Sequence, residues 1–264
     1  MKLRYVAALA CLVAFGPLAV AHADTLADIK ARQKLIVGID LGLPPYGTVD
    51  AAMQPTGSDV AAAQLLADEL GVKLQIVSSV GANRIPFLQT NKVDIVMSSF
   101  SITEARKKVL DFSLPYGVIS IICAAPAGMA IGGPKDLQGK TVAVTRGTGS
   151  DMDATRMVKA DDKISIVRFE DDAMLITALA SGQQDIMIAA PAQMNEANAR
   201  AGKPLLVSKF TVRTNGYAVG IRKGDDGLRA AINAWVAKDL GNGKLRAVYK
   251  QFHGVDLPAE MPKE

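Results

Sequence analysis

The chain has 264 residues, 30 of them basic and 26 acidic, so its formal net charge of +4 is small for its size. That balance gives no reason to expect a nucleic-acid partner. Hydrophobic residues make up 49% of the chain, enough for one or two domains with their own cores.

Residues 1–23 have the pattern of a secretory signal peptide. Two basic residues precede an apolar run over 5–20, and a small-x-small cleavage motif ends at Ala23. The apolar run is too short for a membrane-spanning helix. Cys11 could instead mark a lipid anchor, but the residues before it fit such a site poorly. We therefore expect export and cleavage after Ala23, which leaves one cysteine and no intramolecular disulfide.

Strands and helices alternate along the remaining chain in two rounds. The first round predicts strands at 35–40, 72–78 and 93–97, with helices at 59–70, 84–91 and 103–108. The second predicts strands at 141–144, 164–168 and 185–189, with helices at 151–159, 171–181 and from 192. Such alternation indicates parallel βαβ layers, and two layers imply two lobes with a cleft at the carboxyl ends of their strands.

A short internal similarity supports two copies of one architecture. Residues 88–97 align with 179–188 at an offset of 91, matching a leucine, an Asp-Ile pair and an apolar strand. This short match is informative because it lies at the same position in both rounds of alternating strands and helices.

The segment that follows the strand at 93–97 has the composition of a carboxylate receptor. Ser99 and Ser101 lie where the strand ends, and Thr103 is a good N-cap that puts Arg106 in the first helical turn. A guanidinium fork, hydroxyls and unpaired helix amides together bind carboxylates well. The alternative is a capped surface helix with a solvated arginine.

A glycine-rich loop at 146–150 is the corresponding candidate in the second round. Thr148, Gly149 and Ser150 offer hydroxyls and exposed backbone amides, with Ser150 as the expected cap of the next helix. The loop lacks the lysine of a P-loop and the third glycine of a dinucleotide fingerprint. The alternative is a tight capped turn.

Several segments, in order, resemble the periplasmic solute-binding proteins of ABC importers, specifically the polar amino-acid-binding family (family 3). They are SSFSIT at 98–103, EAR at 104–106, the F-S-x-P-Y turn at 112–116, and the stretches 35–47, 57–74, 136–150 and 216–225. The resemblance implies an α/β fold of the type II periplasmic-binding-protein class, with two lobes, each a mixed, mostly parallel sheet flanked by helices, and a ligand cleft between them. The implied crossings lie near 117–124 and 212–220, which makes lobe 1 residues 24–118 plus 219–264 and lobe 2 residues 119–218.

The resemblance also implies a function. We expect a periplasmic, monomeric protein that captures an amino acid or related small carboxylate and delivers it to an inner-membrane ABC permease, without catalysis, cofactor or metal. His253 is the only histidine after the signal peptide, so a multi-histidine metal site is impossible. The rival hypothesis is a cyclohexadienyl-dehydratase-like enzyme on the same fold, with a carboxylate such as Glu196 as acid or base.

The family's ligand-binding positions map onto residues of both lobes. Ser99, Ser101 and Arg106 map onto carboxylate-binding positions, and the loop at 148–150 onto a segment that closes over the ligand. Tyr46 maps onto an aromatic that lines the cleft, with packing inside lobe 1 as its alternative. The expected ligand-binding residues are Tyr46, Asn83, Arg84, Ser99, Ser101, Arg106, Thr148, Gly149 and Ser150.

Three positions depart from the family pattern. Ala190 stands where members usually carry the aspartate that binds the ligand's ammonium, and Gly81 and Leu43 stand where aromatic residues are frequent. Because an unpaired buried ammonium is costly, either another acid such as Glu196 replaces the missing one or the ligand carries no ordinary α-ammonium. The departures favour the second, a ligand with an extra carboxylate or a modified amine. The acidic run at 170–172 is interpreted as a solvated helix start.

Overall fold

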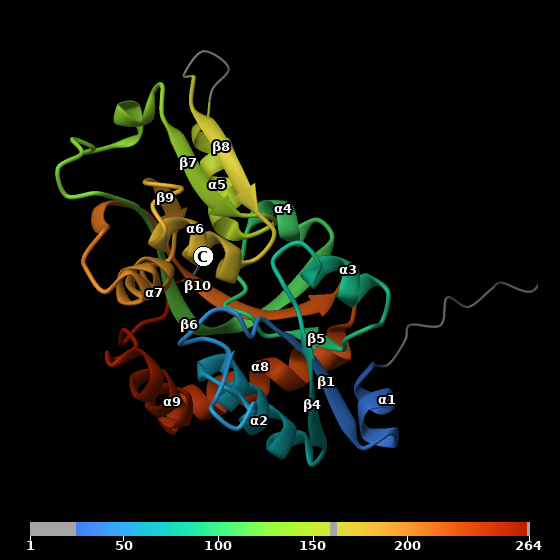
Figure 1. Cartoon of the computed structure of the whole chain (residues 1–264). Coiled ribbons are helices and arrows are strands. Elements are labelled where there is room, and N and C mark those ends of the chain that lie inside the picture. Colours follow the sequence, from blue (N-terminus) through green and yellow to red (C-terminus); the bar gives the residue numbers. More distant parts are fainter. Residues whose placement is uncertain (1–24, 159–162, 263–264) are drawn as a thin grey trace, which may run out of the picture.

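The structure is a computed structural model that describes residues 25–158 and 163–262 (Figure 1). The predicted signal peptide lies outside the described residues. Within the described part of the chain, no helix combines the length and apolar character needed to cross a membrane.

Eight strands form one continuous sheet that runs through both lobes (Figure 1). In spatial order they are β4 (Lys73–Ser78), β1 (Lys34–Ile39), β5 (Ile95–Val96), β10 (Val207–Arg222), β6 (Leu110–Ala125), β9 (Met187–Ala189), β7 (Thr141–Thr145) and β8 (Ser165–Phe169). β1 is parallel to β4 and β5, and β7 is parallel to β8 and β9. Each lobe therefore has its own parallel layer, which confirms the fold class expected from the sequence.

The two crossing strands lie at the centre of this sheet. β6 and β10 are antiparallel to each other, and each is 16 residues long. Both are longer than the crossings expected at 117–124 and 212–220. The reason is that β10 also pairs with β5 in lobe 1, while β6 also pairs with β9 in lobe 2, so the same strands serve as hinge and as sheet members.

Helices flank the sheet in both lobes (Figure 1). In lobe 1 they are α1 (Thr25–Ala31), α2 (Ser58–Leu70), α3 (Arg84–Gln89), α4 (Glu104–Lys107), α8 (Asp226–Gly241) and α9 (Lys244–His253). In lobe 2 they are α5 (Gly149–Met157), α6 (Asp172–Ala180) and α7 (Pro191–Ala201), with a 3-10 turn η1 (Pro134–Leu137). A small hairpin, β2 (Thr48–Val49) and β3 (Pro55–Thr56), precedes α2.

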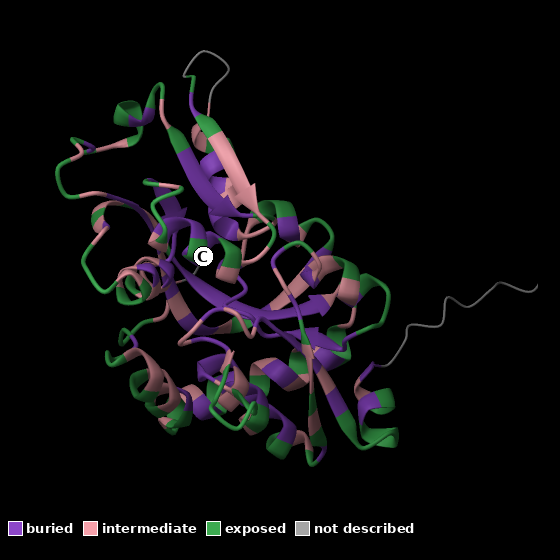
Figure 2. Ribbon diagram, viewed as in Figure 1, coloured by how far each residue is buried: buried purple, intermediate pink, exposed green. Residues whose placement is uncertain are grey.

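The largest hydrophobic core continues from one lobe into the other. It joins buried residues of β1 and α8, such as Val37 and Trp235, to residues of lobe 2 such as Val144, through Ile119 and Val219 of the crossing strands. Figure 2 shows this as a band of buried residues along the sheet. Apolar contact along β6 and β10 therefore ties the two lobes together at the hinge.

The internal similarity seen in the sequence is confirmed. α3 leads to β5 and α6 leads to β9 through equivalent turns, and the aligned residues Asn91 and Gly182 both have positive φ, 57° and 75°. A left-handed residue at this point ends a helix and turns the chain into the next strand. The two lobes therefore place their strand ends, and the loops that follow, by the same local device.

Candidate ligand-binding site

A small cavity lies between the lobes at the carboxyl ends of their strands. Its volume is about 30 Å³. The lining residues are Leu43, Arg84, Ser99, Ser101 and Arg106 from lobe 1, Ile119 and Ile121 from β6, and Thr148, Gly149, Ser150, Asp172, Ala190 and Gln193 from lobe 2. Seven of the nine residues expected from the sequence thus line one cavity, although the chain brings them from three separate segments.

Arg106 spans the gap between the two lobes. The Thr103 side chain caps α4 by accepting a hydrogen bond from the Arg106 amide (3.3 Å), which fixes the start of the guanidinium's side chain. Nη1 donates to the Ser101 carbonyl of lobe 1 (2.8 Å), and Nη2 donates to the Gly147 carbonyl of lobe 2 (2.9 Å). The guanidinium also lies 4.2 Å from the centre of the Phe100 ring, a cation-π contact.

Arg106 is a buried cation of this cavity, and Asp153 attracts it electrostatically without forming an ion pair with it. The residue is 1% exposed, and among residues 25–158 and 163–262 no carboxylate lies within ion-pairing distance of it. Burial, with Arg84 and Arg213 nearby, lowers the pKa of Arg106 to about 9, so the group stays charged at neutral pH. A buried, charged guanidinium bound only to carbonyls is well suited to an incoming anion.

The serines are held in place by a buried carboxylate behind them. The Ser99 amide donates to Oδ2 of Asp59 (2.6 Å), whose Oδ1 accepts from the Tyr116 hydroxyl (2.7 Å). Ser99 itself has a positive φ of 41°. Burial raises the pKa of Asp59 to about 6. This network directs the chain between β5 and α4 toward the cavity.

Arg84 lines the same cavity but already has a partner. Its Nη2 lies 3.0 Å from Oδ2 of Asp40, and both side chains are 4% exposed. Asp40 also accepts a hydrogen bond from the Gly42 amide through Oδ1 (3.0 Å). Asp40 thus orders the loop after β1 and pairs with Arg84, so that Arg106 is the arginine of this cavity without an ion pair among the described residues.

In lobe 2 the glycine-rich loop presents the start of α5 to the cavity. The cap is Thr148, whose hydroxyl accepts from the Asp151 amide (3.2 Å), so the expectation that Ser150 caps this helix is wrong. The helix starts earlier because Thr148 has the extended backbone that a cap needs. A Cβ on Gly149 would lie 2.5 Å from Nη2 of Arg213 in the same lobe and 3.2 Å from Oγ of Ser101 in lobe 1, so a larger residue would crowd the contact between the lobes.

Asp172 is the site residue that the sequence interpretation missed. It is 1% exposed, and its Oδ1 accepts from the Thr145 hydroxyl (2.5 Å) and from Nε2 of Gln193 (3.1 Å). Its Oδ2 has no hydrogen-bond partner, and neither has Oε1 of Gln193, among the described protein atoms. Burial raises the pKa of Asp172 to about 6. The sequence feature that could have identified Asp172 is its position just after β8, at the cleft end of a parallel strand.

Two of the nine expected residues, Tyr46 and Asn83, do not line the cavity, and neither does the candidate acid Glu196. Tyr46 packs in the core of lobe 1, with its ring 5.8 Å from that of Tyr217 and 4.8 Å from that of His253. The expectation that Tyr46 lines the cleft is therefore wrong, and the alternative of packing inside lobe 1 is correct. Asn83 turns back to accept a hydrogen bond from the Val80 amide (2.9 Å). Glu196 pairs with Arg200 along α7 (2.8 Å) and cannot serve as the cavity's acid in this arrangement.

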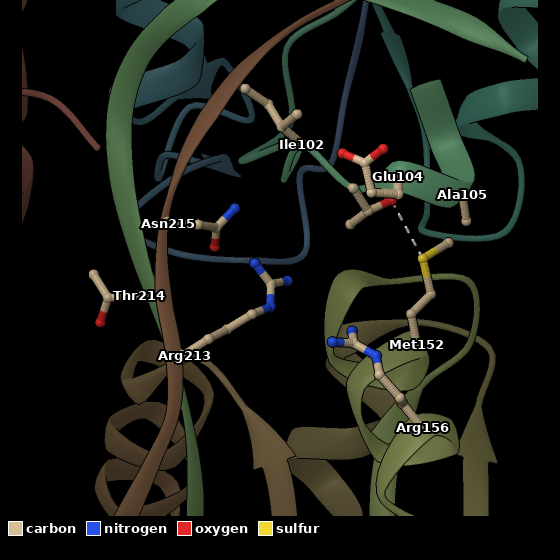
Figure 3. Close-up of a pocket in the computed structure, with 9 residues that line it drawn as sticks. Ile102, Glu104, Ala105, Met152, Arg156, Arg213, Thr214 and Asn215 are labelled. Carbon is tan, nitrogen blue, oxygen red and sulfur yellow. Dashed lines mark hydrogen bonds between the residues drawn. The ribbon is translucent and has the colours of Figure 1, made fainter. Parts of the chain in front are cut away.

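A second, larger cavity of about 590 Å³ adjoins the first (Figure 3). Ile102, Thr103, Met152 and the β10 residues 213–215 contribute to its wall, and the Thr103 hydroxyl donates to the Met152 sulfur across it (3.7 Å). Arg213 and Arg156 both form ion pairs with Asp153, although Nη2 of Arg213 has no hydrogen-bond partner among the described atoms. We place the ligand site in the smaller cavity because Arg106 and Asp172, two buried charged residues without an ion pair, line it. No group of three metal-ligating side chains occurs in the part of the chain that the structure describes.

The lobes are closed on each other around the site. A Cβ on Gly81 would lie 2.5 Å from the Arg146 carbonyl oxygen, and one on Gly147 would lie 2.8 Å from the Ala82 Cα. A volume of 30 Å³ matches about one water molecule. An amino acid therefore fits only if the lobes separate further and Arg106 exchanges the Gly147 carbonyl for the ligand.

The class of protein that this fold and site define is a two-lobed solute-binding protein, and comparison with known families gives the assignment. The chain belongs to the bacterial extracellular solute-binding proteins, family 3, whose sequence profile matches residues 35–255. Proteins of this family in the comparisons are amino-acid-binding components of ABC transporters.

Relatives and solved structures agree with the assignment at modest identity. The chain is 31% identical over 248 residues to the ABC transporter glutamine-binding protein GlnH of Bacillus subtilis, covering 90% of this chain and 87% of that protein. A mutant of ArgBP from T. maritima is similar in structure, with a TM-score of 0.79, 31% identity, and coverage of 88% of this chain and 100% of the other.

One further structure bears on the enzyme alternative. The ancestral amino acid-binding protein AncCDT-1, described as a precursor of cyclohexadienyl dehydratase, has a TM-score of 0.77 and 33% identity, covering 86% of this chain and 99% of the other.

Proposed function

We propose that this protein captures an amino acid or closely related small carboxylate in the periplasm and delivers it to an ABC permease of the inner membrane. The observation that carries the proposal is Arg106, a buried cation without an ion pair among the described residues, in the cavity between the lobes. The ligand's carboxylate would bind its guanidinium, the hydroxyls of Ser99 and Ser101, and the amides at the start of α5.

In this proposal, ligand binding and closure of the two lobes occur together. We place the lobe boundary within β6 and β10, near 118/119 and 218/219, so that lobe 1 is 24–118 plus 219–264 and lobe 2 is 119–218. Rotation about these two strands would close lobe 2 over the ligand. The protein would act as a monomer, since one chain supplies both walls of the cavity.

We propose no chemistry on the ligand. The enzyme alternative deserves a direct test because of the similarity to AncCDT-1, but its candidate acid or base, Glu196, is engaged with Arg200 and does not line the cavity. Incubation with a cyclic precursor of an aromatic amino acid, followed by mass spectrometry, should return that precursor unchanged. Conversion to an aromatic product would replace the transport proposal with the enzyme.

The ligand class can be tested with the purified protein. Mass spectrometry of ligand released from protein purified without refolding, and a thermal-shift panel of the standard L-amino acids, dicarboxylates and N-substituted amino acids, should identify at least one binder. Ligand at 100 times its dissociation constant adds about 2.7 kcal/mol and raises the melting temperature by several degrees. A panel with no shift would overturn the proposed function.

A further inference from the structure

The two walls of the cavity carry opposite buried charges that form no ion pair with the described residues. Arg106 on lobe 1 has only carbonyl oxygens as partners, and Asp172 on lobe 2 has only neutral donors, from Thr145 and Gln193. Both residues are 1% exposed and both line the cavity. Asp153 attracts Arg106 and Arg84 attracts Asp172, in each case without an ion pair. Because buried charges of either sign are costly unless they are paired, a ligand that pairs directly with each would be favoured.

The unpaired atoms are sorted by type in the same way. The lobe 1 residues Arg84 and Arg106 each keep an Nε donor without an acceptor. The lobe 2 residues Asp172 and Gln193 each keep an oxygen acceptor, Oδ2 and Oε1, without a donor. Among the residues that line this cavity, the spare donors are therefore on the lobe 1 wall and the spare acceptors on the lobe 2 wall; the further spare donor, Nη2 of Arg213, belongs to the larger cavity.

Resting on the proposed function, we infer that Asp172, with Gln193, receives the ammonium group of an ordinary zwitterionic α-amino acid, in place of the acid that is absent at Ala190. An ammonium offers three donors and a positive charge, and Asp172 Oδ2 with Gln193 Oε1 offers two acceptors and a negative charge. Ala190 and Asp172 both line the cavity from lobe 2, so Asp172 would supply the carboxylate from the same wall.

This assignment reverses the preference drawn from the sequence alone. In the sequence, the missing acid at residue 190 favours a ligand with a modified amine over replacement by another acid such as Glu196. Asp172 supplies the charge that the sequence comparison did not find. A dicarboxylate without an amine would leave Asp172 buried beside a further negative charge, which is unfavourable.

The test compares Asp172→Asn with a matched control one residue away. Asp171→Asn removes the same charge at the start of the same helix and keeps a good cap, since the Asp171 side chain only accepts from the Met174 amide (2.7 Å). The probes are the twenty standard L-amino acids and L-cystine, with affinities measured by calorimetry. For the tightest binder, its N-acetyl derivative is measured as well.

We expect Asp172→Asn to weaken binding of the tightest amino acid at least tenfold, with Asp171→Asn within twofold of wild type. The N-acetyl derivative should bind wild type at least tenfold more weakly than the free amino acid. A loss of less than tenfold in Asp172→Asn, or equal binding of the N-acetyl derivative, overturns the role of Asp172 while an amino acid still binds. Absence of any amino-acid binding to wild type overturns the proposed function itself, so the two failures are distinguishable.

Discussion

The two walls of the cavity are built alike and charged differently. In each lobe a strand ends, a threonine caps the following helix, and the first helical turn reaches the cavity, with Thr103 and α4 on one side and Thr148 and α5 on the other. Yet the free charge is a guanidinium in lobe 1 and a carboxylate in lobe 2. The repeated fold sets where the walls lie, while single side chains would decide which end of the proposed ligand each wall binds.

Removing the lobe 1 charge should have the largest effect. Arg106→Ala removes a buried cation that has no ion pair within the described residues, and truncation of a buried charge that pairs with a ligand costs on the order of 2 to 5 kcal/mol. Calorimetry with the tightest amino acid should show affinity at least tenfold weaker. Lys108→Ala, which removes an exposed charge from the end of the same helix, should bind as wild type. Wild-type affinity in Arg106→Ala would contradict the carboxylate assignment.

The lobe 2 charge should make binding depend on pH. Burial and the nearby Asp40 raise the pKa of Asp172 to about 6, while its bonds to Thr145 and Gln193 and the nearby Arg84 lower it. Protonation below that pH removes the charge that the ammonium needs, so affinity should fall about tenfold between pH 7.5 and pH 5. The measurement is calorimetry across this range on wild type and Asp172→Asn.

The variant is needed because Asp59, which holds the Ser99 amide, also has a pKa of about 6. We expect most of the pH dependence to disappear in Asp172→Asn. An unchanged pH profile in that variant would assign the effect to Asp59 and the lobe 1 wall instead.

Closure can be weakened without touching either charge. Gly81→Ala places a Cβ 2.5 Å from the Arg146 carbonyl and 2.8 Å from Cγ2 of Thr148, a clash that exists only when the lobes are closed. Overpacking of this kind costs about 1 kcal/mol or more, so affinity should fall roughly fivefold. Scattering should show a smaller ligand-induced decrease in radius of gyration than in wild type. Gly227→Ala, whose added Cβ meets no atom within 4 Å, is the matched control.

The smallest expected effect is on stability without ligand. The folded protein binds a proton on Asp172 more tightly than the unfolded chain does, since the pKa rises from 3.8 to about 6. Stability from this group is therefore present at low pH and is lost as the pH rises through about 6. Asp172→Asn should raise the melting temperature at pH 7.5 by a few degrees, a difference that shrinks toward pH 4. A lower melting temperature at pH 7.5 would show that the charge stabilises the fold.

The sequence could predict the parts of the site that follow from one segment at a time. Ser99, Ser101 and Arg106 come from a strand end and a capped helix, and both features are visible in consecutive residues. The sequence around Asp172 indicates a solvated helix start, because its burial depends on Thr145 and Gln193, which lie on other elements. Tyr46 packs against Tyr217 and His253 instead of lining the cleft. The sequence does not reveal this packing, because these residues are far apart in the chain.

The fold was more predictable than the site for the same reason. Hydrophobic periodicity located α2 and its end at Gly71, and alternation of elements located both parallel layers. The expected crossings at 117–124 and 212–220 are shorter than β6 and β10. The outer residues of these strands depend on pairing with β5 and β9, which periodicity within one strand does not reveal.

Because both walls carry unpaired polar atoms, the closed form would be stable only over a solute that satisfies both walls at once. Closing the lobes over a solute that satisfies only one wall leaves the other wall's groups buried without partners, at about 1 to 3 kcal/mol for each group. A carboxylate without an amine, or an amine without a carboxylate, would therefore hold the lobes together only briefly. A permease that engages the closed form would then respond to whole amino acids and ignore their fragments, even where those fragments are abundant.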